Sequence, residues 1–361
     1  MAEWKSGRIS IRSTPQSVDE SIYNSEACLQ TLKKVYRNFC KAIYSAMIHW
    51  SRLLVGGIAL PLVLPWLVYN LYRSHFKNKI FRNRSLEDKV VLITGASSGL
   101  GEALAHAFYK AGTKVILAAR RKDALEKVKN DLITKYPSKH TPVVLTLDLH
   151  DLKRIPQKAR EAVDLYGHID ILVNNGGISY RGEISETDLE VDLRVMVTNY
   201  FGPVALTKAI LPSMMERNSG CIIAISSVQG KIAIPFRSAY SASKHATQAF
   251  FDTLKSELSH TNIHVCVVSP GYVHTNLSLN AVTARGELYG VMDESTAAGM
   301  DPHDAAENII IATAAKRSEL LLAGILPKIA IFIRVFSSWL YFYLMGSRAR
   351  RIRAANMIKE D

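Results

Sequence analysis

The sequence predicts an α/β fold, a doubly wound parallel sheet that follows an N-terminal membrane anchor. Between residues 85 and 325, short apolar runs alternate with stretches of helical periodicity, and the runs end on small or polar residues. Such runs suit strands that are buried on both faces, as in a parallel sheet with helices on either side. The anchor is predicted because residues 53–71 form a stretch of 19 residues without charge.

The first predicted strand, residues 90–93, is followed by a glycine-rich turn and a helix. The turn carries Gly95, Gly99 and Gly101, and the sequence EALAHAFYKAG reads as a helix that ends at Gly112. Strand, glycine turn and helix form the context that a Rossmann-type dinucleotide site requires. The glycines let the backbone approach a pyrophosphate, and the helix N-terminus offers it free N–H groups.

The second predicted strand ends at Arg120 and Arg121. A site for NAD usually carries Asp or Glu near this point, whose carboxylate accepts a hydrogen bond from the ribose 2′-OH. Two guanidinium groups instead suit a 2′-phosphate by charge and by geometry. Ser97 and Ser98 in the glycine turn could add hydroxyl donors, so the sequence favours NADP(H). The alternative is that both arginines only cap a strand in solvent.

Four further apolar runs are predicted as strands of the same sheet. In an open parallel sheet, ligands bind beside the carboxyl ends of the strands. Small and polar residues at those ends are therefore candidates for a binding site. The four runs end at Asp148, at Asn174 and Asn175, at Ser226 and Ser227, and at Pro270 and Gly271.

Three polar residues, Ser227, Tyr240 and Lys244, form a second candidate motif. Tyr240 and Lys244 stand at i and i+4, so they share one face of a helix. An ammonium beside a phenol favours the phenolate, which would lower the pKa of Tyr240 from about 10 toward neutrality and suit it to proton transfer. The Ser227 hydroxyl can polarise a carbonyl group, so the set is suited to interconverting a ketone and an alcohol. One Tyr-x-x-x-Lys is expected by chance in such a chain, and the glycine turn upstream adds the necessary support.

Together these motifs resemble the short-chain dehydrogenase/reductase family in order and spacing, over about residues 86–325. We expect the seven strands in the order 3-2-1-4-5-6-7, and the resemblance implies a substrate lid in residues 276–300. One departure is Gly176, where the family has Ala, which predicts a slightly looser strand end. The matching residues are Thr94, Gly95, Gly99, Gly101, Asp148, Asn174, Asn175, Gly177, Asn199, Ser227, Tyr240, Lys244, Pro270 and Gly271.

The resemblance implies a catalytic role for four residues. Tyr240 would be the general acid in reduction and the base in oxidation. Lys244 would lower the pKa of Tyr240 and bind the nicotinamide ribose. Ser227 would orient the carbonyl oxygen, and Asn199 would hold a water that links Lys244 to solvent.

The cofactor set combines the glycine turn, the two arginines and the residues that the resemblance implies. Asp148 would lie by the adenine, Asn175 near the adenine ribose, and Thr275 at the nicotinamide carboxamide. The predicted NADP(H)-binding residues are Gly95, Ser97, Ser98, Gly99, Leu100, Gly101, Arg120, Arg121, Asp148, Leu149, Asn175, Tyr240, Lys244, Pro270, Gly271, Val273 and Thr275.

The net charge of +13 is concentrated at the two ends of the chain. Residues 1–84 carry +9 and residues 322–361 carry +5, while residues 85–321 carry −1. A nucleic-acid-binding domain would carry basic charge on its folded face, so no nucleic acid is expected as a partner. Basic flanks around apolar segments suit a membrane with anionic lipid.

The N-terminal part is predicted to attach the protein to a membrane. Residues 1–25 are expected to be disordered, residues 26–52 to form an amphipathic helix, and residues 53–72 to form the anchor. Pro61, Pro65 and Asn70 weaken a spanning helix, so an interfacial hairpin or a monotopic anchor remains open beside a single span. We expect the endoplasmic reticulum membrane, with the peroxisomal membrane as the alternative.

The C-terminal tail, residues 326–361, is apolar, aromatic and basic at its end, and is predicted to be amphipathic. Lys328 and Arg334 interrupt it, which disfavours a span. A helix lying on the membrane beside the active-site opening is expected, and a dimer-packing or core-covering segment is the alternative.

The sequence as a whole predicts a membrane-attached, NADPH-dependent oxidoreductase that interconverts a ketone and a secondary alcohol. Its substrate would be lipophilic, such as a steroid, a retinoid or a ketone precursor of glycerolipids. The family resemblance also implies a homodimer. The alternative is a membrane-tethered NADP-binding module that regulates a partner and turns over little.

Overall fold

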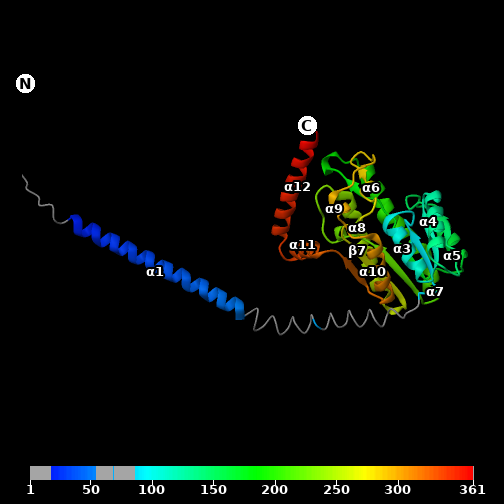
Figure 1. Ribbon diagram of the computed structural model, residues 1–361, viewed down its shortest axis with the longest axis horizontal. Coiled ribbons are helices and arrows are strands. Elements are labelled where there is room, and N and C mark those ends of the chain that lie inside the picture. The colour runs from blue at the N-terminus through cyan, green and yellow to red at the C-terminus, as the bar shows by residue number, and fades with distance from the viewer. Residues whose placement is uncertain (1–17, 54–67, 69–85, 361) are drawn as a thin grey trace, which may run out of the picture. The chain divides into compact units, whose positions relative to one another are not determined.

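The computed structural model describes residues 18–53, residue 68 and residues 86–360. The chain divides into two compact units, Met1–Phe76 and Lys77–Asp361. In the first unit, α1 (Val18–Leu53) is one continuous helix (Figure 1). Residues 18–25, for which disorder was expected, are included in this helix.

The predicted amphipathic helix, residues 26–52, lies within α1. Its apolar side chains Tyr36, Phe39, Met47 and Trp50 are largely exposed. The predicted anchor, residues 53–72, lies outside the described residues except for residues 53 and 68. Within the part of the chain that the structure describes, no helix is both long enough and apolar enough to cross a membrane.

The second unit is built on a parallel sheet of seven strands, as the Rossmann-type prediction requires. The strands lie in the order β3-β2-β1-β4-β6-β7-β9, which differs from the predicted numbering because two short strands intervene in the chain. Their bounds are β1 (Val90–Thr94), β2 (Lys114–Ala119), β3 (Val143–Thr146), β4 (Ile171–Asn174), β6 (Gly220–Ile225), β7 (Ile263–Pro270) and β9 (Glu319–Leu322).

Helices cover both faces of this sheet (Figure 1). Alternate residues of β1 show why: Val91 and Ile93 pack into one hydrophobic core, and Val90 and Leu92 pack into the other. The first core is closed by α3 (Gly99–Lys110), α4 (Lys122–Lys135) and α10 (Pro302–Ala314). The second core is closed by α5 (Ile155–Asp164), α7 (Gly202–Glu216) and α8 (Ser238–Glu257).

The two short strands, β5 (Tyr180–Arg181) and β8 (Val282–Thr283), pair with each other in parallel as a separate sheet. β8 and the short helix α9 (Glu294–Ala297) belong to the segment predicted as a lid, residues 276–300. β5 follows β4, and β8 follows β7, so this small sheet lies beyond the carboxyl ends of the main strands. The helix α6 (Leu189–Met196) runs into α7 through a π-helical turn, Val197–Phe201.

The chain ends in two helices, α11 (Ile325–Phe336) and α12 (Ser338–Glu360). They follow the edge strand β9 directly. Where β9 ends, the Leu322 carbonyl oxygen accepts a hydrogen bond from the Gly271 amide, with 2.7 Å between N and O. The end of β7 and the end of β9, which precedes the tail, are therefore joined by main-chain bonding.

Candidate active site

A cavity of ≈890 Å³ lies at the carboxyl ends of the main strands. Strand-end residues from across the main sheet meet there, as expected for an open parallel sheet. The predicted site residues that line it are Gly95, Ser97, Ser98, Gly99, Leu100, Gly101, Arg120, Arg121, Asp148, Leu149, Asn175, Ser227, Tyr240, Lys244, Pro270, Gly271, Val273 and Thr275. Two predicted residues do not line the cavity: Asn199 and the strand-end candidate Asn174.

Two glycines of the turn between β1 and α3, Gly95 and Gly101, leave no room for a side chain. Gly95 has a φ of +67°, and a Cβ atom on Gly101 would lie 2.2 Å from the Gly95 carbonyl oxygen. α3 begins at Gly99, and no side chain caps its first turn. Such a helix N-terminus presents N–H groups to the cavity, so the turn fits a dinucleotide pyrophosphate.

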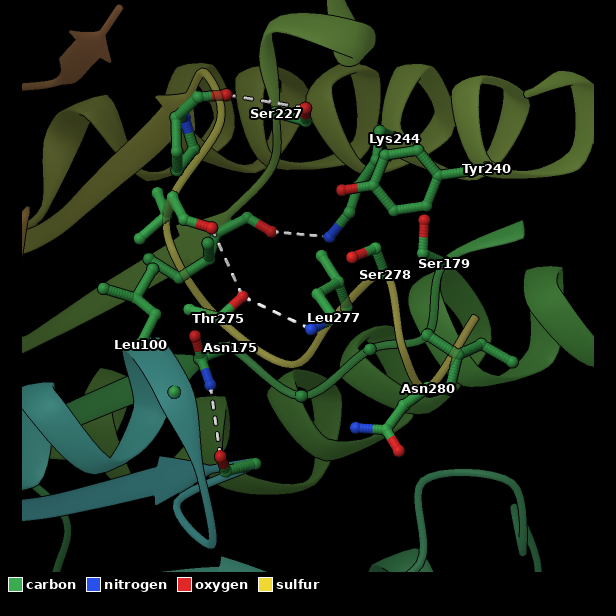
Figure 2. A pocket seen from close by; sticks show the side chains of 18 of the residues that line it. Leu100, Asn175, Ser179, Ser227, Tyr240, Lys244, Thr275, Leu277, Ser278 and Asn280 are labelled. Carbon is green, nitrogen blue, oxygen red and sulfur yellow. Dashed lines mark hydrogen bonds between the residues drawn. The ribbon is translucent and has the colours of Figure 1, made fainter. Parts of the chain in front are cut away.

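Thr94 and Asn175 hold this turn against β4. The Thr94 hydroxyl accepts hydrogen bonds from the amides of Asn175 and Gly176, each at 3.0 Å. The Asn175 side-chain amide donates to the Thr94 carbonyl oxygen at 2.9 Å (Figure 2). A Cβ added at Gly176 would lie 2.7 Å from Leu149 Cδ1, so Leu149 occupies part of the space that an alanine methyl group would need.

The end of β2 carries the two predicted phosphate ligands. Arg120 and Arg121 are both exposed and both line the cavity. Arg121 Nη2 donates to Ser97 Oγ at 3.4 Å, so these two candidate donors lie side by side. Asp148, at the end of the next strand, accepts a hydrogen bond from the His150 amide at 2.9 Å and so shapes its own loop.

At the other end of the cavity, α8 presents Tyr240 and Lys244 from one face (Figure 2). Lys244 Nζ lies 5.7 Å from the centroid of the Tyr240 ring and donates to the Ile225 carbonyl oxygen at 2.8 Å. Ser227 follows β6, and its hydroxyl accepts from the Gln229 amide at 3.1 Å and donates to the Pro270 carbonyl oxygen at 3.5 Å. Figure 2 shows the polar ends of Ser227, Tyr240 and Lys244 directed into the same space.

Burial dominates the electrostatics of this group. Burial raises the pKa of Tyr240 above its ordinary value, although a hydrogen bond with Ser227 and the charge of Arg181 oppose the rise. Burial also lowers the pKa of Lys244 to about 8. The predicted lowering of the Tyr240 pKa by Lys244 was therefore wrong, since desolvation of the phenolate outweighs the favourable charges. The phenol keeps its proton at neutral pH, which is the form that can donate in a reduction.

Asn199 lies behind the cavity in the π-helical turn and is buried. Its side-chain oxygen accepts from the Ile178 amide at 2.8 Å, and its side-chain nitrogen donates to the Ile178 carbonyl oxygen at 2.9 Å and to Ser243 Oγ at 3.0 Å. Asn199 thus braces the loop after β4 against α8. Its predicted role in holding a water stays a prediction.

Comparison with known proteins adds the evolutionary relationship. Residues 89–285 match the family model described as short chain dehydrogenase. The chain belongs to the short-chain dehydrogenase/reductase family. It is an oxidoreductase by that membership, and the family uses nicotinamide cofactors.

Individual members of the family are similar over most of the chain. An Anopheles gambiae protein named "Dehydrogenase/reductase SDR family protein 7-like" is 52% identical, over 83% of this chain and 95% of that protein. Mouse "Dehydrogenase/reductase SDR family member 7B" is 49% identical, over 81% of this chain and 91% of that protein. A crystal structure of a short-chain dehydrogenase from Streptomyces avermitilis is 34% identical with a TM-score of 0.62, and it covers 74% of this chain and 98% of its own.

Three charged residues near Tyr240 were not among the predicted site residues of this short-chain dehydrogenase. Arg181 of β5 donates from Nε to Asp293 Oδ2 at 2.9 Å, and a second bond joins Arg181 Nη2 to the same oxygen. Arg237, which precedes α8, lies 3.3 Å from Asp293 Oδ2 through its Nη2. All three side chains are mostly buried, and burial lowers the pKa of Arg237 to about 10. The Asp293 carboxylate thus joins the segment predicted as a lid to β5 and to the start of α8.

The sequence gives no local signal for this cluster. Arg181 and Asp293 are 112 residues apart and meet only because β5 and the lid segment fold together. The tail was expected to lie beside the active-site opening, and in the structure it contributes side chains to the cavity itself. Leu326, Pro327 and Ala330 of α11, with Met345 and Arg348 of α12, line the cavity.

The inner side of the tail packs on the catalytic domain. Tyr341 is 2% exposed, packs with Val228 and Ile232, and donates a hydrogen bond to the Ala233 carbonyl oxygen. The core-covering alternative for the tail therefore holds for this inner side. On the outer side of the tail, large apolar side chains are exposed instead.

Proposed function

We propose that this protein is a membrane-attached, NADPH-dependent oxidoreductase that interconverts a ketone and a secondary alcohol on a lipophilic substrate. One observation carries the proposal: a single cavity joins the glycine turn and Arg121 to Ser227, Tyr240 and Lys244. A dinucleotide laid along the turn would bring its nicotinamide toward the catalytic residues. Proton donor and cofactor would then act on one bound carbonyl group.

The chain's own residues supply binding, orientation and the proton. When bound, the reduced nicotinamide supplies the hydride that the carbonyl carbon receives. The Tyr240 hydroxyl, protonated because it is buried, donates its proton to the carbonyl oxygen, and the Ser227 hydroxyl holds that oxygen in place. Lys244, fixed by the Ile225 carbonyl, places positive charge beside the phenol as the proton leaves. In the oxidation direction Tyr240 takes the proton back.

NADP(H) is the proposed cofactor because two guanidinium groups stand at the end of β2. Arg120 and Arg121 offer charge and paired donors to a 2′-phosphate. Ser97 lies within reach of Arg121 and adds a hydroxyl on the same side.

Two features support a lipophilic substrate and attachment to a membrane. The tail residues that line the cavity include Leu326, Pro327, Ala330 and Met345, all apolar. The chain also carries the uncharged stretch at residues 53–71 with basic flanks. We propose the endoplasmic reticulum membrane as the location, with the peroxisomal membrane as the alternative.

The proposal is tested with the purified full-length chain in detergent. Oxidation of NADPH and of NADH is followed in the presence of steroid, retinoid and glycerolipid-precursor ketones. We expect at least one lipid ketone to be reduced, with NADPH preferred. Tyr240→Phe should bind NADPH with unchanged affinity and lose turnover by roughly a thousand-fold or more, because the proton donor is gone.

Two other outcomes would contradict parts of the proposal. If no ketone across the panel is turned over while NADPH binds tightly to both proteins, the chain is an NADP-binding regulatory module rather than a reductase. A preference for NADH would overturn the assignment of Arg120 and Arg121 and leave the reductase chemistry intact.

A further inference from the structure

The outer side of the α11–α12 pair exposes a band of large apolar side chains. Six of them form what we call the docking face, and each is between 59% and 76% exposed. Isolated exposed apolar residues are ordinary on a protein surface, but a contiguous group of this size is not. The docking face consists of Phe332, Val335 and Phe336 on α11 and Trp339, Phe342 and Tyr343 on α12.

Four of these side chains pair with a neighbour on their own helix. The rings of Phe332 and Phe336 lie 4.2 Å apart between centroids, and those of Trp339 and Tyr343 are stacked at 5.9 Å. The guanidinium of Arg334 lies 5.2 Å from the centre of the Phe342 ring and so links the two helices. The opposite side of the pair, by contrast, is packed on the domain through Tyr341.

The charge around the docking face has one sign. Residues 325–359 contain seven Lys and Arg and no Asp or Glu. Lys328, Arg334, Arg350 and Arg351 are exposed. Anionic lipid headgroups attract such a segment, and Trp and Tyr rings favour the depth of those headgroups. Long basic side chains can lie along the apolar surface and keep their charges in the headgroup layer.

A second copy of the chain fits this face less well. A two-fold contact would place each basic segment against the same basic segment of the partner. Like charges brought together in this way oppose association, whereas an anionic bilayer neutralises them.

We propose that the docking face binds the surface of an anionic lipid bilayer and sets the mouth of the cavity against it. Leu326 is 75% exposed and also lines the cavity, so the apolar surface of the tail continues into the site. A lipophilic ketone could then pass from the bilayer to Tyr240 along α11 without crossing water. This inference deepens the proposed function, because it names where the substrate enters.

The test reads the contact of α11–α12 with lipid and needs no turnover, so it can fail independently of the proposed reductase activity. The full-length chain, with Trp4, Trp50 and Trp66 replaced by Phe, retains Trp339 as its single tryptophan. It is mixed with phosphatidylcholine–phosphatidylserine vesicles whose acyl chains are brominated. We expect strong quenching of Trp339 fluorescence, and weaker quenching on vesicles of phosphatidylcholine alone. Flotation shows in each case that the protein is on the vesicles.

Two variants isolate the docking face. Val335→Asp with Phe336→Asp should abolish most of the quenching, while Ile133→Asp, an exposed apolar residue on α4, should leave it unchanged. Lys328→Glu with Arg334→Glu should remove the preference for phosphatidylserine. NADPH binding by all three proteins shows that the domain is folded.

The proposal is overturned if Trp339 stays unquenched while the chain floats with the vesicles, since the N-terminal part alone would then hold the membrane. It is also overturned if sedimentation shows a dimer that Val335→Asp with Phe336→Asp dissociates, because the face would then be an interface between copies.

Discussion

Lys244 Nζ lies over the Tyr240 ring, 5.7 Å from its centroid, but its hydrogen bond goes to the Ile225 carbonyl. Burial alone lowers the pKa of Lys244, to about 8. The Lys244 amine is thus held in place by a strand of the main sheet. Its position and its titration follow from packing, and both can be tested without a substrate.

The depressed pKa of Lys244 makes stability depend on pH. Its pKa is about 8 in the folded protein against 10.5 ordinarily, so between these values the unfolded chain binds more protons and stability rises with pH. Lys244→Met removes this dependence. The variant should gain stability relative to the native protein below pH 8, by roughly 1.4 kcal/mol for each unit of pKa difference, before the lost hydrogen bond is subtracted. The difference in unfolding free energy between the two proteins should narrow steadily from pH 8 to pH 10.5.

Urea denaturation of both proteins at several pH values measures that gap. Lys255→Met, which removes an exposed lysine from the same helix, serves as the control and should show a gap independent of pH. A constant gap for Lys244→Met would show that Lys244 titrates alike in the folded and unfolded chains.

Cofactor choice should depend on the end of β2. Arg120→Ala with Arg121→Ala removes two charge-assisted partners of a 2′-phosphate, so affinity for NADPH should fall roughly 10- to 100-fold while affinity for NADH changes little. Fluorescence titration with both cofactors measures the two affinities. Lys122→Ala removes a neighbouring cation that does not line the cavity, and it should affect neither cofactor. Equal losses for NADPH and NADH would count against a phosphate site here.

The ion cluster at Asp293 should hold the lid segment closed. Asp293→Asn leaves Arg181 and Arg237 without their carboxylate in a mostly buried site, which costs roughly 3–5 kcal/mol for an interaction of this kind. The local opening of residues 276–300 should therefore become faster, and trypsin should cleave after the exposed Arg285 sooner. Glu287→Gln changes an exposed acid of the same segment and should leave the cleavage rate as it was. Identical cleavage of both variants would show that the cluster does not control the segment.

Gly176 should be sensitive to a single methyl group. In Gly176→Ala the new Cβ would meet Leu149 Cδ1 at 2.7 Å and the Gly95 amide nitrogen at 3.3 Å, so Leu149 must move where it borders the cavity. We expect NADPH binding to weaken by about five-fold, or about 1 kcal/mol. Leu149→Ala in the same chain should recover part of that loss, as a double-mutant cycle of NADPH affinities can show. Gly324→Ala, where no atom lies within 4 Å of an added Cβ, is the control.

The parts of the site whose residues lie close together in sequence could be predicted without the structure. Gly95, Gly99 and Gly101 form one turn, and Tyr240 and Lys244 lie one helical turn apart, so spacing alone predicted their arrangement. The strand ends at Asp148 and Pro270 could be placed because parallel strands share one carboxyl edge.

The rest of the site depends on tertiary packing, which local sequence patterns do not predict. Asp293 meets Arg181 through the small sheet of β5 and β8, whose strands of two residues are too short for a periodic signal. The direction of the Tyr240 pKa shift depends on how completely the ring is desolvated, which the spacing to Lys244 does not reveal. The start of α1 at Val18 was missed because its polar residues were read as disorder.

The cavity is lined by two stretches of chain, one within the family match and one beyond it. The match to the family ends at residue 285, whereas α9, α11 and α12 come after it. The predicted cofactor-binding residues precede residue 285. The tail helices α11 and α12, which line another part of the cavity, follow the edge strand β9. Exchanging the segment after β9 between homologues should therefore change substrate selectivity and leave the cofactor-binding residues unaltered.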